Sequence, residues 1–387
     1  MKGMIIFDDH DIKQIGNIKK KTNFKLTGNI ILAASPIIRK KGNIFSLQYN
    51  FTEDEGNKLR EYDQQLDKIL DNYKFKPKQN ESIKAFIKLS TNNLSGVIYG
   101  VGQGNFIKLN CGNEIILFDV GFTISEDHEK NPIIKKSSEM VHSIKPNMII
   151  LSHWHLDHII GVTYMNSDYI YSTENFWIGP FPILGKTSVS AKRLCVYLIK
   201  LCNVYLIKSK LKENVIGNDN FTLWRGEGTN NNDSGLLLTL QMQNPAQAFL
   251  FAGDCSWEKM PKEIFEKGYR FLVVSHHGSK QKMPEGFKGS EKKAYSIICT
   301  GKNTYGHPHV ETIEQLNLQG FANILFTAGI QAIYFWWQQG KGVKAKKCYT
   351  VEELEKSEKE DCVMNVDDEP QFQNLFFDMM YKSTLHK

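Results

Sequence analysis

The sequence first excludes several kinds of protein by what it lacks. Its seven cysteines are odd in number and include no C-x-x-C pair, which argues against a disulfide framework, a zinc ribbon or a thiol redox motif and favours a reducing compartment. No segment approaches 18 uninterrupted apolar residues, and the first residues lack the long apolar region of a secretory signal. We therefore expect a soluble cytoplasmic protein with no membrane partner.

A strong charge of either sign is also missing. The chain has 48 Lys and Arg residues against 42 Asp and Glu residues, which gives a net charge of +6. This net positive charge is smaller than that of a dedicated nucleic-acid binder, although it would not repel a phosphate substrate. The hydrophobic content of 41% excludes a disordered chain, and 387 residues allow two or three domains, or one large α/β domain with extensions.

The first part of the chain is Lys-rich and irregular, and we expect residues 1–90 to form an N-terminal accessory region. Thr52–Glu55 has the form of a capping box, and apolar residues follow at spacings of three to four, which predicts a helix over 53–74. The polar stretch 76–80 after it is typical of a linker. This region could cap a site, form a homodimer or bind a protein partner, and the sequence leaves all three open.

From about residue 84 the chain consists of short apolar runs separated by Gly, Asn and Asp. Turn residues at 111–113 and 244–247 predict hairpins, and helices are expected at Trp257–Lys267 and Val310–Leu318. This pattern predicts an α/β fold with mixed sheets covered by helices, in a catalytic domain over 91–340 followed by an acidic C-terminal extension over 341–387. The expected strands are Ala85–Leu89, Phe106–Leu109, Ile115–Phe118, Met148–Leu151, Leu236–Met242, Phe249–Phe251, Phe271–Val274, Tyr295–Cys299, Ile324–Thr327 and Ala332–Trp336.

Seven of the 11 histidines fall in three short clusters, each after a strand-like run or in a Gly-flanked loop. The strongest cluster is an H-x-H-x-D-H motif made by His153, His155, Asp157 and His158. His153 and His155 are two residues apart, so in extended chain they project on the same side, while Asp157 and His158 lie in the turn that follows. Three imidazoles and a carboxylate within six residues suit two adjacent divalent ions.

Two later strands end in residues of the same chemistry. Asp254 follows the apolar run 248–252, and its carboxylate could bridge two metals, although an Asp before a helix is also a common N-cap. The pair His276 and His277 follows Phe271–Val274; one of them would close the second metal site and the other would lie near the substrate. We assign His276 to the metal and His277 to catalysis, with the choice between them open.

Three further features fit around this centre. Asp119 ends a strand and could orient a ligand histidine, and the loop with His307 and His309 could offer an imidazole to an anionic substrate. Gly100–Gly104 does not have the G-x-G-x-x-G spacing of a nucleotide-binding loop and is followed by a strand, so we expect a tight turn near the site.

Taken in order, these motifs resemble the metallo-β-lactamase fold, an αββα sandwich with a metal centre at one edge of two packed sheets. Within that superfamily they are most similar to the ComEC-type domain of bacterial DNA-uptake channels. The supporting segments are Gly100–Asn105, Asp119–Gly121, His153–His158, Asn231–Ser234, Gly253–Asp254, Ser275–Ser279 and Tyr305–His309. The membrane channel of the uptake proteins is absent, and Asn105 stands where that subgroup commonly has Asp.

The resemblance implies that the H-x-H-x-D-H residues and Asp254 bind two divalent ions, completed by His276 or His277. No histidine lies between His158 and His276, where lactamases of the superfamily have a further ligand of the first metal. Asn232, Asp233 or water could fill that place, so Mn²⁺ competes with Zn²⁺. Residues expected to orient a ligand or to contact substrate are Asp119, Asn105, Asn232, Asp233 and Ser279.

Two divalent ions suit displacement at phosphorus, so the leading hypothesis is a phosphodiesterase. The most favoured activity is that of a nuclease, which would cleave DNA or RNA with a metal-activated hydroxide. Asp157 or Asp254 would orient the nucleophile, and His277, His307 or His309 would protonate the leaving oxygen or stabilise its charge. The alternatives are a hydrolase of cyclic nucleotides or esters, and a non-catalytic protein whose metals are structural and which binds a partner. Lysines available for phosphate contacts, or simply solvated, are Lys280, Lys282 and Lys302.

Overall fold

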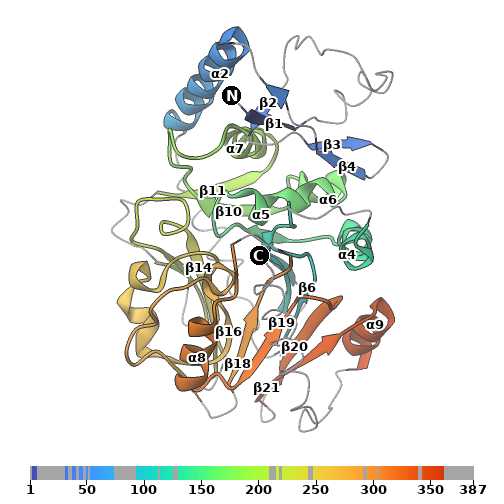
Figure 1. Cartoon of the computed structure of the whole chain (residues 1–387), viewed down its shortest axis with the longest axis vertical. Helices are drawn as coiled ribbons and strands as arrows, with labels where there is room; N and C mark the ends of the chain where they lie inside the picture. The colour runs from blue at the N-terminus through green and yellow to red at the C-terminus, as the bar shows by residue number, and fades with distance from the viewer. Residues whose placement is uncertain are drawn as a thin grey trace, which may run out of the picture.

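The computed structural model contains two large β-sheets that pack face to face, with helices on their outer sides (Figure 1). Within the part of the chain that the structure describes, no helix is both long enough and apolar enough to cross a membrane. The described residues are 2–6, 31–33, 37–40, 43–46, 49–50, 53–73, 93–111, 114–124, 130–208, 215–217, 220–242, 247–290, 294–302, 305–338 and 342–360.

Each large sheet has eight strands. The order of the first sheet is β11 (Asn203–Ile207), β10 (Phe176–Pro180), β9 (Met148–Ile150), β8 (Glu114–Val120), β7 (Phe106–Cys111), β6 (Asn93–Tyr99), β20 (Ala332–Gln338) and β21 (Gly342–Cys348). The order of the second is β12 (Val215–Gly217), β13 (Phe221–Arg225), β14 (Leu236–Gln241), β15 (Ala248–Phe251), β16 (Gly268–Val273), β18 (Tyr295–Ile298) and β19 (Asn323–Phe326), with β17 (Lys288–Gly289) paired to β16.

Both sheets are mixed, as the sequence predicts. The strand pairs β7–β8 and β14–β15 are antiparallel, which confirms the two expected hairpins. Strands β8 to β11 run parallel to one another, and so do β15, β16, β18 and β19. The carboxyl ends of parallel strands meet at one edge of a sheet, and that edge is where the candidate site lies.

Alternating side chains divide the core into layers. On β8, Ile116 and Phe118 face the space between the sheets, while Leu117 belongs to the cluster on the outer side. On β15, Phe249 lies in the inner cluster and Leu250 in the outer one. This period of two is the one expected of strands that are buried on both faces. The two sheets enclose the inner cluster, and an outer cluster separates each sheet from its helices, which gives the four layers of an αββα sandwich.

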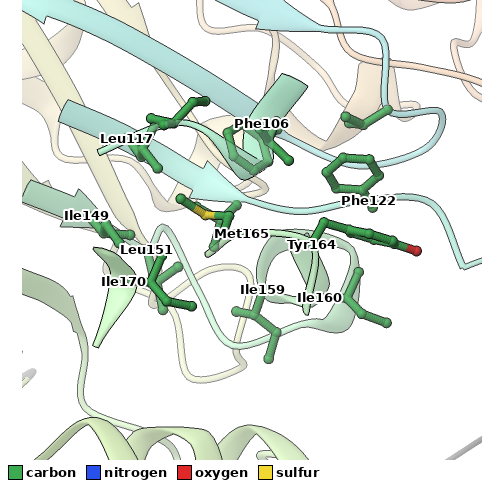
Figure 2. Packing of buried hydrophobic residues seen from close by; sticks show 14 of the residues in the cluster. Phe106, Leu117, Phe122, Ile149, Leu151, Ile159, Ile160, Tyr164, Met165 and Ile170 are labelled. Carbon is green, nitrogen blue, oxygen red and sulfur yellow. The ribbon is translucent and has the colours of Figure 1, made fainter. Parts of the chain in front are cut away.

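The outer cluster on the first sheet packs under several helices. Figure 2 shows part of it, in which Phe106, Leu117 and Leu151 contribute from the sheet and its edge and Ile159 and Ile170 from the short helices beyond. Each of these side chains is at most 3% exposed, so removing one would leave a cavity in a closely packed interior. The helices of this layer are α4 (Pro132–His142), α5 (Leu156–Ile159), η1 (Ile160–Thr163), α6 (Ser167–Ile170) and α7 (Val189–Leu201).

The other sheet is covered by α8 (Val310–Leu318) and by two short 3₁₀ helices, η2 (Trp257–Lys259) and η3 (Lys262–Glu266). The prediction of α8 is confirmed. The single helix expected over Trp257–Lys267 is wrong, because Pro261 stands between the two 3₁₀ segments, where its ring fixes φ and removes a hydrogen-bond donor.

The N-terminal region contributes a small sheet and one long helix. The sheet contains β1 (Lys2–Ile6), β2 (Ile31–Ala33), β3 (Ile37–Lys40), β4 (Asn43–Ser46) and β5 (Tyr49–Asn50). The predicted helix is confirmed as α2 (Glu53–Asp71), which packs against α7 (Figure 1). The predicted capping residue Thr52, the linker 76–80 and the strand Ala85–Leu89 lie outside the described residues.

The first sheet continues past residue 340. Strand β21 pairs along its whole length with β20, and α9 (Val351–Glu360) packs on these two strands. Lys108 on β7 forms an ion pair of 2.6 Å with Glu358 on α9. Residues 342–360 are therefore part of the sandwich.

Candidate metal centre

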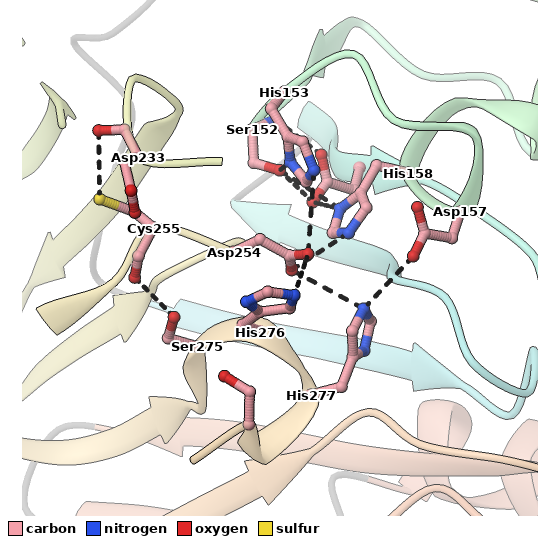
Figure 3. Close-up of polar contacts among 12 residues, drawn as sticks. Ser152, His153, Asp157, His158, Asp233, Asp254, Cys255, Ser275, His276 and His277 are labelled. Carbon is pink, nitrogen blue, oxygen red and sulfur yellow. Dashed lines mark hydrogen bonds and ion pairs between the residues drawn. The ribbon is translucent and has the colours of Figure 1, made fainter. Parts of the chain in front are cut away.

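The candidate centre lies where four strands end at the same edge of the sandwich (Figure 3). Asp119 is the next-to-last residue of β8, and His153 follows β9 by three residues. Asp254 follows β15, and the His276–His277 pair lies in a short turn, η4 (Ser275–Gly278), after β16. The strand order β9–β8 in one sheet and β15–β16 in the other explains why motifs distant in sequence meet here.

Four side chains form a tight donor group. Ligand atoms of Asp157, His158, Asp254 and His277 all lie within 4.8 Å of one another. The Nε2 atom of His158 is 3.2 Å from Asp254 Oδ1, and Nε2 of His277 is 3.7 Å from the same oxygen. His277 Nε2 is also 3.7 Å from Asp157 Oδ2. Two carboxylates and two imidazoles at these separations make a set that a divalent cation can hold together.

The second oxygen of Asp254 faces a different set of imidazoles. Its Oδ2 atom lies 3.8 Å from His153 Nε2 and 3.8 Å from His276 Nε2. The ring of His155 lies beside that of His153, with the ring centroids 4.6 Å apart. Asp254 therefore stands between two groups of nitrogen donors, with one carboxylate oxygen toward each, which is the arrangement of a bridging carboxylate.

Hydrogen bonds at the other ring nitrogen fix how three histidines present themselves. The backbone N–H and the hydroxyl of Ser152 donate to Asp119 at 2.6 and 2.7 Å. Because that hydroxyl hydrogen is used, Ser152 Oγ accepts from Nδ1 of His153 at 3.0 Å. His158 Nδ1 donates to Asp119 at 2.7 Å. Both rings therefore turn Nε2 toward Asp254.

His277 is oriented in the same way by the main chain. Its Nδ1 donates to the carbonyl oxygen of Cys299 at 2.8 Å. Nε2 of His277, like Nε2 of His153 and of His158, is buried and has no hydrogen bond. Oδ1 of Asp254 is likewise buried without one. Buried polar atoms without a partner are rare because each costs about 1–3 kcal/mol, so four of them converging on one point fit a site for divalent cations.

The charges at this point favour a cation as well. Burial lowers the pKa of His158, but the carboxylates of Asp254 and Asp119 outweigh it and hold that pKa well above its usual value. Burial raises the pKa of Asp254, but His158 and His277 outweigh burial and hold it well below its usual value. Burial, reinforced by His158, keeps the pKa of His153 well below 6.5, so this ring stays neutral and able to ligate.

Strained backbone supports the same conclusion. Among the described residues other than glycine, three have positive φ: Asp119 (58°), His276 (50°) and His277 (55°). All three belong to the centre. The left-handed region is unfavourable for residues with a Cβ atom, and outliers of this kind tend to gather at functional sites. The double kink at His276 and His277 sends their two rings to different oxygens of Asp254.

Glycines let the chain pass very close to the carbonyl of Asp157. A Cβ atom at Gly121 would lie 1.6 Å from Asp157 O, and one at Gly104 would lie 2.9 Å from it. The backbone N–H of Asn105 donates to the same carbonyl at 3.2 Å. The tight turn that the sequence predicts at Gly100–Gly104 is thus confirmed beside the centre. The side-chain Oδ1 of Asn105 is buried and has no hydrogen bond.

The loop with His307 and His309 forms a rim beside the centre. The ring of His307 lies 5.5 Å from that of His276, 5.6 Å from that of His309 and 5.8 Å from that of Tyr305, measured between centroids. Burial, reinforced by His276, His277 and His309, lowers the pKa of His307 to about 4. Its imidazole is therefore neutral at pH 7, and the phenol ring of Tyr305 is 67% exposed next to it.

The remaining predicted residues lie close by with other contacts. Asp233 accepts hydrogen bonds from Ser256 and Asn230, while Asn232 has a buried Oδ1 without one. Ser279 accepts a hydrogen bond from Gln281. Among the three lysines, Lys280 pairs with Glu311 at 2.5 Å on the surface, and Lys282 and Lys302 are exposed.

Two functional groups were not identified from the sequence. Ser152 joins Asp119 to His153, and its position directly before the H-x-H-x-D-H motif was the available signal. The carbonyl oxygen of Cys299 orients His277, and no side-chain pattern reveals a main-chain acceptor, so only the structure could show it.

No protein-family description and no curated protein sequence matches this chain. Solved structures are similar at low identity. One is YhfI of Bacillus subtilis, a metallo-β-lactamase fold protein, with 10% identity over 66% of this chain and 99% of that one, at a TM-score of 0.36. Another is a diphosphatase of the PhnP family, with 14% identity over 60% of this chain and 94% of that one, at a TM-score of 0.35.

The sheets and helices of this chain have the layered arrangement expected of the metallo-β-lactamase fold.

Proposed function

We propose that this chain is a metal-dependent hydrolase that cleaves phosphodiester bonds, with nuclease activity as the leading candidate. The observation that carries the proposal is the position of Asp254. One oxygen lies 3.2 and 3.7 Å from Nε2 of His158 and His277, and the other lies 3.8 Å from Nε2 of His153. Several of these atoms are buried and lack hydrogen bonds, as expected of ligands for two divalent ions that share one carboxylate.

The geometry supports a definite division of the ligands. His277 belongs to the four-donor group, whereas the side chain of His276 is 34% exposed. We therefore infer that His277 is a ligand and that His276 faces the substrate, which reverses the assignment made from the sequence. One ion would be held by Asp157, His158, Asp254 and His277, and the other by His153, His155 and Asp254.

When bound, two divalent ions supply a water nucleophile of lowered pKa and neutralise charge that develops at phosphorus. The chain itself would orient the substrate through His276 and the rim histidines. Because the pKa of His307 is about 4, its neutral ring would act at pH 7 as a hydrogen-bond donor to a phosphate oxygen, and another group would protonate the leaving oxygen. His309, on the same loop, is the remaining rim imidazole for that second task.

The choice of nucleic acid as substrate depends on the sequence motifs. We predict from these motifs a similarity to the ComEC-type domain, and this similarity supports a polynucleotide as the substrate. We propose Zn²⁺ or Mn²⁺ as the ions, because a centre that combines imidazoles with carboxylates accepts both.

The experiment is a cleavage assay on purified protein loaded with Mn²⁺ or Zn²⁺. Linear DNA, linear RNA, cyclic dinucleotides and a simple ester are offered separately to the wild type and to the double variant His153→Ala/His155→Ala. We expect the wild type to cleave DNA or RNA and the double variant to be at least about 100-fold slower, because metal-ion catalysis supplies most of the rate. His142→Gln, an exposed histidine on α4, is the matched control and should retain wild-type activity.

Each other outcome has a definite meaning. Cleavage of cyclic dinucleotides or esters alone would replace the nuclease by a small-molecule hydrolase. Equal activity of the wild type and the double variant on every substrate would refute the proposal. Tightly bound metal without any turnover would favour a structural metal site in a partner-binding protein.

A further inference from the structure

The two sides of the candidate centre are unequally supplied with ligands. Among the His, Cys, Asp and Glu side chains that the structure describes, one group has its ligand atoms within 4.8 Å of one another, and it contains neither His153 nor His155. On their side, these two histidines have the Oδ2 atom of Asp254 as a carboxylate donor, and the nearby His276, 3.8 Å from that oxygen, is the imidazole assigned above to the substrate. A divalent ion takes at least four ligands, so this position has room for a donor of another chemical type.

A turn of the second sheet lies directly against His153. This turn, residues 230–235, leads into β14, and the first N–H of that strand, on Leu236, donates to the carbonyl of Ser152 at 2.7 Å. A Cβ atom placed on Gly235 would lie 3.6 Å from Cβ of His153 and 2.8 Å from the carbonyl oxygen of Asn232. The absence of a side chain at Gly235 therefore lets the turn approach the metal-ligand segment closely.

Most side chains of the turn are held by hydrogen bonds within the protein. Asn230 accepts from the backbone of Asp233 at 2.8 Å and donates to its carboxylate at 2.7 Å. Asn231 accepts from Thr187 at 3.0 Å, and Ser234 donates to the carbonyl of Asn230 at 2.6 Å. These bonds fix the turn before any ligand arrives.

Asp233, the charged residue of the turn, is also satisfied. Its Oδ1 accepts from the backbone N–H and the hydroxyl of Ser256, at 3.0 and 2.6 Å, and its Oδ2 accepts from Asn230. These bonds lower the pKa of Asp233 despite its partial burial, which acts in the opposite direction. The carboxylate thus joins the turn, through its hydrogen bonds to Ser256, to the segment after Asp254.

Asn232 differs from its neighbours, because its Oδ1 atom is buried and has no hydrogen bond. We propose that this amide oxygen is a ligand of the ion held by His153 and His155, an inference that rests on the metal centre of the proposed function. An amide oxygen is a hard, neutral donor of the kind that Mn²⁺ accepts readily. A neutral ligand there would also limit the negative charge around Asp254 and leave the ion more electrophilic.

The test measures metal binding directly, with no need for activity. Mn²⁺ and Zn²⁺ are titrated in competition with a chromophoric chelator into the full chain and into Asn232→Ala, Asn232→Asp and Asn232→His. We expect the wild type to bind two ions and Asn232→Ala to bind one of them about 10–100-fold more weakly, by analogy with other losses around metal sites. Asp and His keep a donor, so both should retain two ions, and His should shift the preference toward Zn²⁺.

Asn231→Ala is the matched control, since it removes a neighbouring asparagine that bonds Thr187 and leaves Asn232 in place. It should bind both ions like the wild type. Circular dichroism spectra identical to the wild type show that each variant is folded. Two ions bound to Asn232→Ala with wild-type affinity would overturn the role of Asn232 alone, and so would equal losses in Asn231→Ala and Asn232→Ala. A wild type that binds no metal would instead overturn the proposed function itself, and this inference with it.

Discussion

Asp119 and His158 form a buried pair in which His158 Nδ1 donates to Asp119 Oδ2 at 2.7 Å, and neither side chain is exposed. The same carboxylate accepts two hydrogen bonds from Ser152, which in turn contacts His153. One acidic residue thus sets the ring orientation of histidines on both sides of Asp254. Such indirect contacts hold metal ligands in the tautomer that binds.

We expect Asp119→Asn to weaken metal binding by about 10–100-fold while the protein stays folded. The amide is isosteric and tolerates the positive φ of this position, but it lacks the negative charge that stabilises the ligand histidines. Chelator competition with Mn²⁺ and Zn²⁺ measures the change. Asp168→Asn, on the exposed face of α6, is the control. Unchanged affinity in Asp119→Asn would contradict the orienting role.

Much of this centre could be predicted from the sequence because its residues directly follow apolar strands. Parallel strands share a carboxyl edge, so motifs at the ends of β8 and β9 meet in one sheet and those at the ends of β15 and β16 meet in the other. That the two edges face each other follows from the packing of the sheets. The same reasoning identified α2 and α8, whose apolar residues recur at helical spacing.

What could not be predicted depends on contacts distant in sequence. The different directions of the His276 and His277 rings depend on two consecutive residues with positive φ, a strain that the surrounding structure must impose. Strands β10 and β11 lie at one end of the first sheet and were not recognised from their sequence. Two 3₁₀ segments stand where one helix was expected, because Pro261 interrupts a helix despite the helical spacing of the apolar residues around it.

Gly121 is a second position where the centre depends on close packing. A Cβ atom there would lie 1.6 Å from the carbonyl oxygen of Asp157. We expect Gly121→Ala to lower the free energy of unfolding by about 3 kcal/mol, the upper range for overpacking, and to weaken metal binding by displacing Asp157. Urea denaturation and chelator competition measure the two effects.

Gly179→Ala is the control for this prediction, because a Cβ atom on this glycine of β10 would come no closer than 3.4 Å to any other group. It should change the free energy of unfolding by less than about 1 kcal/mol. If both variants lost the same stability, the close approach at Asp157 would not be the cause.

Lys192 fastens the N-terminal helix to the sandwich. Its ammonium group is fully buried on α7 and lies 2.5 Å from Asp63 and 2.6 Å from Asp67, both on α2. We expect Lys192→Met to destabilise the protein by about 2 kcal/mol, below the range for a fully buried pair because the carboxylates reach water. It should also speed proteolytic cleavage within α2. Lys200→Met, at an exposed position on the same helix, should change neither the stability nor the rate of cleavage within α2. Rapid cleavage in both variants would refute the prediction.

The rim residue His307 should make stability fall in acid. Burial and the histidines around it lower its pKa to about 4, whereas an unfolded histidine has a pKa of about 6.5. Between these values the unfolded chain binds the proton and the folded chain does not, so stability decreases as the pH falls from 6.5 to 4. Between pH 7 and pH 4.5, we expect the free energy of unfolding of metal-free His307→Gln to fall by about 1 kcal/mol less than that of the metal-free wild type. The difference is this small because water screens the half-exposed ring. Urea denaturation at both pH values measures the difference, with His142→Gln as the exposed control. Parallel losses in the wild type and His307→Gln would show that the ring titrates normally in the folded protein.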